Sequence, residues 1–341
     1  MYKDRTNMTF GDMAIAGRNR NEFLKKVNEL IDWNPIEKLL KKHLKRGANA
    51  IGNPAYSELL LFKILLLQTW YNLSDPKVEE AIYDRVSFML FLNLSTDSSV
   101  PDYSTICRFR NSLIPKNIDK KLFLEINEQL TKQGIMVQNG AVVDATIISS
   151  SRRPRKDDEL ITEDRKEAET SEINTESRIE TTYSKDKEAR WIKKCGKYFY
   201  GYKVHNAVNK EGYILGGVIT GANAADISHL EDVLNELELT EGLPVLADKG
   251  YPSEYNKNAV ESRGLVDKIM RKATKSRKLT EEDHIFNKEI SRYRYVVEQT
   301  FGLLKLHFGF TKMRYISKRK ATLEYYLKSL SFNLKKASLS Q

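Results

Sequence analysis

Residues 141–149 read AVVDATIIS, an apolar, largely β-branched run interrupted by one carboxylate, Asp144. This composition predicts a buried strand. A second apolar stretch, PVLAD at 244–248, predicts another buried strand that ends on Asp248. An unpaired buried carboxylate costs several kcal/mol, so each position needs a partner. Either aspartate alone could simply cap a turn, but two in one sheet favour a cation between them.

The segments around these strands predict an α/β fold, a mixed sheet with helices on its faces. YGYKVHNAV and YILGGVITG flank residues 209–212 and predict a hairpin, and VDKIMR predicts a short strand. Helices are expected over 227–239, 253–263, 280–306 and 321–337.

The N-terminal part predicts helices only. Residues 1–53 are basic with helical spacing, KRGANAIGNP is typical of a linker, and residues 54–133 predict a helical domain. Within that domain PDYSTICRFRNSL predicts a short helix, capped by Ser104 or Thr105. This helix presents three polar side chains, Arg108, Arg110 and Asn111. It is either the recognition helix of a helix-turn-helix or a packing helix.

Residues 149–198 break the pattern. They contain 13 basic and 12 acidic residues and few apolar ones, which predicts a charged insertion that is exposed or partly ordered.

Composition limits the partners and the compartment. A net charge of +10 favours a polyanion, either nucleic acid or an anionic membrane surface. Two distant cysteines make neither a disulfide scaffold nor a zinc site, so a cytoplasmic location is expected. The longest apolar run, residues 59–67, is too short to span a bilayer, and the N-terminus carries no apolar signal core.

A third carboxylate lies in ISRYRYVVEQTFGLLKLHF. At about 100° per residue, Arg294, Glu298 and Lys305 fall within roughly 40° of one another on a helix. A neighbouring apolar stripe is expected to pack on the sheet; it consists of Ile290, Val297, Phe301 and Leu304. The alternative is a solvated face on which Arg294 and Glu298 form an ordinary ion pair.

Taken together, these segments resemble the DDE transposases of bacterial insertion sequences, in the insertion sequence five family, over nearly the whole chain. PDYSTICRFRNSL and the helical stretch before it resemble the N-terminal signature, and VVDATII, ADKGY and the Arg294–Glu298–Lys305 helix resemble the three catalytic segments. GYKVHNAV and TGANAADISHL resemble the core between the first two acids. At one position the chain departs from the pattern, because Ser291 stands where relatives have tyrosine.

The resemblance implies a ribonuclease-H-like catalytic domain over 139–337 that performs metal-dependent DNA cleavage and strand transfer at terminal inverted repeats. Asp144, Asp248 and Glu298 would be the catalytic acids and would hold two Mg²⁺ ions, with Mn²⁺ able to substitute and Asp144 as the bridging ligand. Implied partners are double-stranded DNA, both the terminal repeats and the target, and a second subunit on DNA, but no membrane and no small-molecule cofactor. The location implied is the bacterial nucleoid. Expected DNA contacts are Arg294, Lys305, Ser291, Arg108, Arg110, Asn111, Lys249 and His205.

The sequence leaves several alternative functions and residue roles open. A metal nuclease without strand transfer and a catalytically dead DNA-binding regulator are the alternative functions. His205 is a substrate contact or, more simply, a hairpin residue with a structural hydrogen bond. Asp226 is expected to cap a helix, and Trp191 stacks either on DNA or on the hairpin. The insertion is expected near a second DNA end or subunit.

Basic and aromatic residues are concentrated near the C-terminal end of the chain. Residues 268–320 hold fifteen lysines and arginines against five acids, interleaved with aromatics, a pattern that suits DNA.

Overall fold

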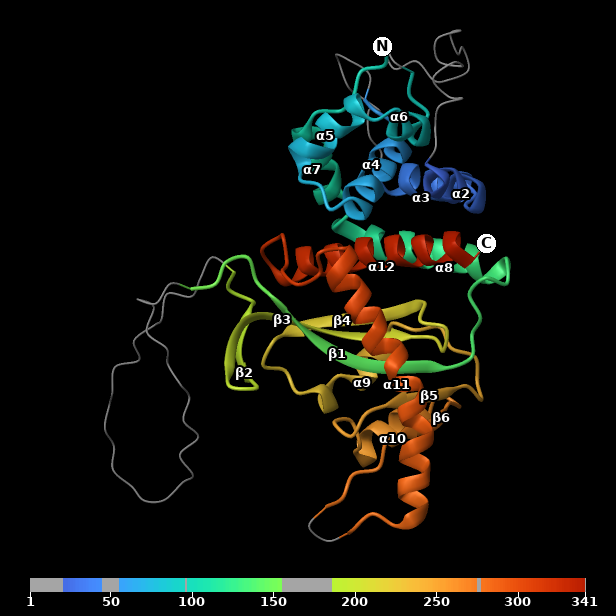
Figure 1. Ribbon diagram of the computed structural model, residues 1–341, viewed down its shortest axis with the longest axis vertical. Coiled ribbons are helices and arrows are strands. Elements are labelled where there is room, and N and C mark those ends of the chain that lie inside the picture. Colours follow the sequence, from blue (N-terminus) through green and yellow to red (C-terminus); the bar gives the residue numbers. More distant parts are fainter. Residues whose placement is uncertain (1–20, 45–54, 96, 155–185, 275–276, 341) are drawn as a thin grey trace, which may run out of the picture.

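The computed structural model describes residues 21–44, 55–95, 97–154, 186–274 and 277–340. Figure 1 shows a layer of helices at one end of the molecule and a sheet with its own helices at the other. Two helices, α8 (Ile118–Lys132) and α12 (Lys318–Ser340), lie side by side between them. The N-terminal helices therefore stand on one side of this pair and the sheet on the other.

The sheet is mixed, as predicted. Its strands follow the order β2-β3-β1-β5-β6, with β4 also paired to β3. The central strand β1 is antiparallel to β3 and parallel to β5, and β5 is parallel to β6. The strands are β1 (Ala141–Ser149), β2 (Arg190–Lys194), β3 (Lys197–Val208), β4 (Ile214–Gly221), β5 (Pro244–Ala247) and β6 (Val266–Ile269).

Helix α11 (Glu281–His307) crosses the sheet and contacts β1, β3 and β5. Its apolar stripe is buried as predicted, with Ile290, Val297, Phe301 and Leu304 all at most 6% exposed. α9 (Leu230–Asn235) packs on β3 and β4, and α10 (Glu254–Glu261) packs on β6. The polar face of α11 adjoins this stripe, so it lies where the helix crosses β1 and β5.

The helical layer is built around α4 (Glu58–Trp70), which is buried nearly all round, as its uniformly apolar sequence predicts. It packs against α3 (Trp33–Leu44) and α12, and the Trp70 indole donates a hydrogen bond to the Ser331 carbonyl at 2.9 Å. One continuous core runs from Leu24 to Ala337. The remaining helices of this layer are α2 (Glu22–Leu30), α5 (Asp75–Asp84), α6 (Val86–Leu92) and α7 (Tyr103–Ser112).

Two local predictions were wrong. The helix expected over 227–239 is a 3-10 turn at Asp226–Ser228 followed by the short α9. Asp102 caps α7, rather than Ser104 or Thr105, through a 2.6 Å bond from the Thr105 amide. The end of the charged insertion is β structure, because β2 and the start of β3 pair with each other. The insertion's residues 155–185 lie outside the described residues.

Among the helices that the structure describes, none combines the length and apolar character needed to cross a membrane.

Candidate active site

The sheet brings the two aspartates together. In the parallel pair β1–β5, Val143 is opposite Ala247, so Asp144 and Asp248 follow at the same level on neighbouring strands. Asp248 ends its strand in a tight turn, in which its Oδ1 accepts a hydrogen bond from the Gly250 amide at 2.7 Å. Asp144 Oδ1 accepts one from the Ala145 amide, also at 2.7 Å.

Helix α11 adds the third acid and a cation. Arg294 Nη2 lies 3.0 Å from Glu298 Oε1, 3.9 Å from Asp144 Oδ2 and 4.0 Å from Asp248 Oδ2. The predicted polar face of α11 thus points at the sheet edge where the aspartates lie, and the Arg294–Glu298 pair is part of this cluster. Three carboxylates therefore converge on one guanidinium.

The cluster carries more negative charge than Arg294 balances. Burial, with the nearby charges of Asp248 and Glu298, raises the pKa of Asp144 to about 6, against the opposing influence of the Ala145 amide and Arg294. Three ionised carboxylates and one guanidinium leave a net charge of −2 here. A site of this kind favours additional positive charge.

The donor set fits hard divalent cations, although the present arrangement is not a formed metal site. No group of three His, Cys, Asp or Glu side chains in the described ranges is arranged to hold a metal ion. In this cluster the Arg294 guanidinium lies among the carboxylates. Carboxylate oxygens are the ligands that Mg²⁺ and Mn²⁺ prefer, and Asp144, Asp248 and Glu298 supply them.

Lys305, on α11, reaches β1, the strand that carries Asp144. Its Nζ donates to Thr146 Oγ1 at 2.6 Å, and Thr146 follows Asp144 by two residues on the same face of β1. Burial, and then the positive charge of Lys194, lower the pKa of the Lys305 ammonium. The structure therefore holds a lysine next to the acid cluster, as the helical spacing predicted.

His205 does not reach this site. Asp144 is opposite Asn206, so His205 points to the other face of the sheet. It is 0% exposed, its Nε2 lies 2.9 Å from Thr220 Oγ1, and burial followed by the nearby His229 lowers its pKa to about 4. The predicted contact between His205 and DNA was wrong. The alternative, a hairpin histidine with a structural hydrogen bond, was right.

The structure also decides between the alternatives for Asp226 and Trp191. Asp226 does not cap a helix: Ala225 holds the N-cap position, and Asp226 Oδ1 pairs with Lys203 Nζ at 2.9 Å. Trp191 packs on the hairpin, with its ring 5.1 Å from that of Tyr200.

Tyr251 was missed by the sequence reasoning. It is 1% exposed, and its hydroxyl has no hydrogen-bond partner among the described residues. Burial and the carboxylates of Asp226, Asp144 and Asp248 raise its pKa. The only signal in the sequence was its place three residues after Asp248, in the turn that closes β5.

The residues predicted on α7 separate into two groups. Arg110 is 3% exposed, and its guanidinium binds both oxygens of Asp75 at 2.6 Å, so its predicted DNA contact was wrong. Arg108 and Asn111 are exposed on the outer side of α7. Their role stays a prediction.

Two further predicted DNA contacts lie near the acids in the chain. Ser291 is exposed, and its hydroxyl donates to the Asn287 carbonyl within α11 at 2.9 Å. Lys249 is exposed directly after Asp248. Their contacts with DNA stay predictions.

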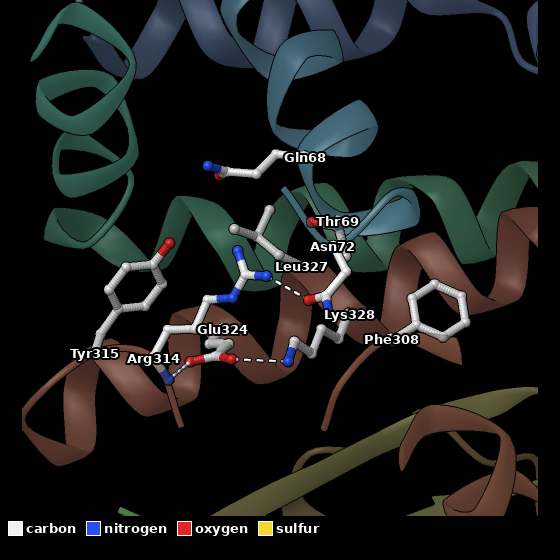
Figure 2. Close-up of a pocket in the computed structure, with 9 residues that line it drawn as sticks. All are labelled: Gln68, Thr69, Asn72, Phe308, Arg314, Tyr315, Glu324, Leu327 and Lys328. Atoms are coloured by element: carbon white, nitrogen blue, oxygen red, sulfur yellow. Dashed lines mark hydrogen bonds and ion pairs between the residues drawn. The ribbon is translucent and has the colours of Figure 1, made fainter. Parts of the chain in front are cut away.

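A pocket between α4 and α12 lies where the helical layer packs on the segment after α11 (Figure 2). Its charged side chains are paired: Glu324 with Lys328 at 2.8 Å, and Arg314 with the Leu73 carbonyl at 2.7 Å. Glu324 and Lys328 are 3% and 5% exposed. Its lining does not include any of the three acids of the candidate active site.

Comparison with known proteins agrees with this geometry. A family model described as Transposase DDE domain matches residues 136–334, and one described as Transposase domain (DUF772) matches residues 14–112. A curated relative, the transposase for insertion sequence element IS1106 of Neisseria meningitidis serogroup B, is 40% identical over 235 residues. The match covers 68% of this chain and 77% of that protein.

Solved structures also show likeness. A piggyBac transposase synaptic complex with hairpin DNA has a TM-score of 0.46 at 12% identity, covering 95% of this chain and 77% of that one. The Mos1 strand transfer complex has a TM-score of 0.20 at 11% identity, covering 86% and 80%. The first family match spans all three acids together with Arg294 and Lys305. The chain therefore belongs to the DDE transposases of bacterial insertion sequences, enzymes that cleave DNA and transfer the cut strand.

Proposed function

We propose that Asp144, Asp248 and Glu298 are the catalytic acids and the ligands of two Mg²⁺ ions. The observation that carries this proposal is their convergence on Arg294, all within 4.0 Å of one guanidinium nitrogen. When bound, such ions activate the attacking oxygen and stabilise the leaving oxygen in phosphodiester transfer. By analogy with the family, Asp144, the most buried of the three at 19% exposed, would be the ligand shared by both ions.

The chain's own cations would bind the DNA backbone. Lys305 is held beside β1 by Thr146 and can place an ammonium on a phosphate next to the acids. Arg294 Nε is buried without a partner among the described residues, and its guanidinium would leave the carboxylates for phosphate once they hold metal. Ser291 precedes Arg294 on α11, and Lys249 directly follows Asp248, so both are proposed to contact the same DNA strand.

The sheet supports a ribonuclease-H-like core. Its order β4-β3-β1-β5-β6 has three antiparallel strands followed by two parallel ones, and the acids lie on the central strand, its parallel neighbour and the helix that crosses them. The exposed side of α7, with Arg108 and Asn111, is proposed to bind the terminal inverted repeats, and the chain is proposed to belong to the insertion sequence five family.

The central test is charge removal at each acid. Asp144→Asn, Asp248→Asn and Glu298→Gln should each abolish cleavage of a duplex carrying the element's end, while binding to that duplex is kept. Asp232→Asn is the matched control, since Asp232 is exposed and, among the described residues, pairs with His229 on the surface. Full cleavage by any of the three variants removes that residue from the site. Chelation of divalent metal should stop the reaction, and Mn²⁺ should restore it.

Strand transfer and assembly need separate measurements. Joining of the cut end to a target duplex distinguishes this proposal from a nuclease that only cuts. Cutting and joining two ends at one target requires two active sites, so we propose at least a dimer on DNA. Light scattering of the protein–DNA complex measures this. A one-protein, one-end complex that completes strand transfer would contradict the dimer.

A further inference from the structure

The hairpin formed by β2 and the start of β3, residues 190–198, is the second basic feature near the acids. It is named the basic hairpin here. Figure 1 shows it curling away from the rest of the sheet. Its turn is formed by Cys195 and Gly196, both with positive φ, which is the geometry that suits a tight two-residue hairpin. Lys193, Lys194 and Lys197 stand on both sides of this turn and are exposed.

These lysines have no acidic partner. Within the part of the chain that the structure describes, none of the three pairs with a carboxylate, and Lys193 lies 5.3 Å above the ring of Tyr198. Tyr198 is itself 51% exposed. Lys25 and Lys132, by contrast, each bind a carboxylate one turn away on their own helix. Among the described residues, the basic hairpin therefore presents positive charge that no carboxylate balances, around an aromatic ring, a combination that suits a nucleic-acid backbone.

The base of the hairpin is firmly attached to the strand that carries Asp144. Asp186, 0% exposed, precedes β2 and accepts a hydrogen bond from Ser150 Oγ at 2.6 Å, just past the end of β1. The same carboxylate accepts from the Tyr202 hydroxyl and from the Ser317 amide. Burial of this carboxylate with several donors fixes where the hairpin leaves the sheet.

The hairpin continues the strand that runs beside Lys305. Along β3, Asn206 is opposite Asp144, Val204 is opposite Thr146, whose hydroxyl binds Lys305, and Gly201 is opposite Ser149 at the end of β1. The hairpin turn lies further along β3 in the same direction, so Lys305 is placed between the acid cluster and the hairpin lysines. Burial, and then the positive charge of Lys194, lower the pKa of the Lys305 ammonium, and an anion bound near both ammonium groups would offset their repulsion. A phosphate of the cleaved strand would meet this need.

We propose that the basic hairpin binds the phosphate backbone of the DNA strand that runs past Lys305, as part of the same active site. The inference rests on the proposed function, because it assumes that Lys305 contacts the substrate. It assigns the described end of the charged insertion, residues 190–198, to the DNA beside the acids. A second subunit is not needed for this contact.

The first test measures the salt dependence of DNA binding. The triple variant Lys193→Gln, Lys194→Gln, Lys197→Gln should lower the slope of log K against log salt by about 2.7, since each lost phosphate contact removes about 0.9. The probe is a short duplex of arbitrary sequence in chelator, so that catalysis plays no part. The control is Lys25→Gln, Lys41→Gln, Lys132→Gln, which removes the same charge from lysines that have helical partners. The control should keep the parent slope.

The second test uses the natural thiol at the hairpin tip. Cys195 is exposed, and Cys107 is the other cysteine of the chain. Cys107→Ser protein should form a disulfide with duplexes that carry a tether ending in an activated mixed disulfide on phosphates next to the cleaved end, because the Cys195 thiolate attacks that disulfide and the activating thiol leaves. The same duplexes should not react with Cys195→Ser protein.

Either of two results would overturn the proposal: a folded triple variant with the parent slope, or no cross-link above the Cys195→Ser background. If the triple variant fails to fold, Lys194→Gln alone should lower the slope by about 0.9, and the cross-link remains decisive. Failure of the metal site is a separate outcome. It would appear as full cleavage by Asp144→Asn, while the triple lysine variant still lowers the salt slope and Cys195 still forms the cross-link.

Discussion

Replacing Asp144 by asparagine tests the electrostatics of the acid cluster without any measurement of catalysis. The pKa of Asp144 in the metal-free protein rises from an ordinary value of 3.8 to about 6, chiefly through burial. At 1.36 kcal/mol for each pH unit, this corresponds to about 3 kcal/mol of native-state destabilisation at neutral pH. Asparagine keeps an oxygen for the Ala145 amide and removes the charge, so Asp144→Asn should stabilise the metal-free protein by up to that amount.

The pH dependence has a defined sign. Between pH 3.8 and about 6, native Asp144 holds a proton that the unfolded chain has released. The native state binds more protons in this window, so its free energy of unfolding falls as pH rises through it. The full cost is present above about pH 6 and absent below 3.8. The advantage of the asparagine variant should therefore be largest at pH 7.5 and vanish near pH 4.

The assay is thermal and urea unfolding in chelator at pH 7.5, 5 and 4. A gain of about 3 kcal/mol should raise the melting temperature by roughly 5 °C in a chain of this size. Asp119→Asn is the contrasting control: Asp119 is 0% exposed and binds Arg319 through both oxygens, so its loss should cost about 3 kcal/mol. An Asp144→Asn protein that is less stable than the parent at pH 7.5, or equally favoured at pH 4, would refute the reasoning.

Three further substitutions test the roles of single basic side chains. Arg110→Ala should cost about 3 kcal/mol in urea unfolding, because it leaves Asp75 without its buried partner; a change under about 0.5 kcal/mol would contradict this. Arg108→Ala should leave the free energy of unfolding within about 0.5 kcal/mol of the parent and weaken binding to the element's ends at matched salt. Equal binding would end its recognition role. Lys305→Ala should lower the salt slope of DNA binding by about 0.9 and slow cleavage, whereas a parent-like slope would show that Lys305 touches no phosphate.

The sequence alone located β1 and β5 and the carboxylates that stand out in their apolar runs, because both depend on local pattern. AVVDATIIS and PVLAD are apolar runs in which one carboxylate is conspicuous, and each became the predicted strand. The stripe and polar face of α11 follow from 3.6-residue periodicity, which predicted the side on which Arg294, Glu298 and Lys305 lie. The family resemblance then connected segments that are far apart in the chain.

Other features depend on which distant segments pack together, and no local pattern carries that information. Arg110 and Arg108 look alike in the sequence, but α5 brings Asp75 to Arg110 and buries it. His205 points away from the acids because the β1–β3 register pairs Asn206 with Asp144. The end of the insertion is polar yet forms β2, since pairing with β3 satisfies its backbone without an apolar core. The sharing of Arg294 by three carboxylates likewise arises only when β1, β5 and α11 meet, because the attraction between charges depends on their distance in space.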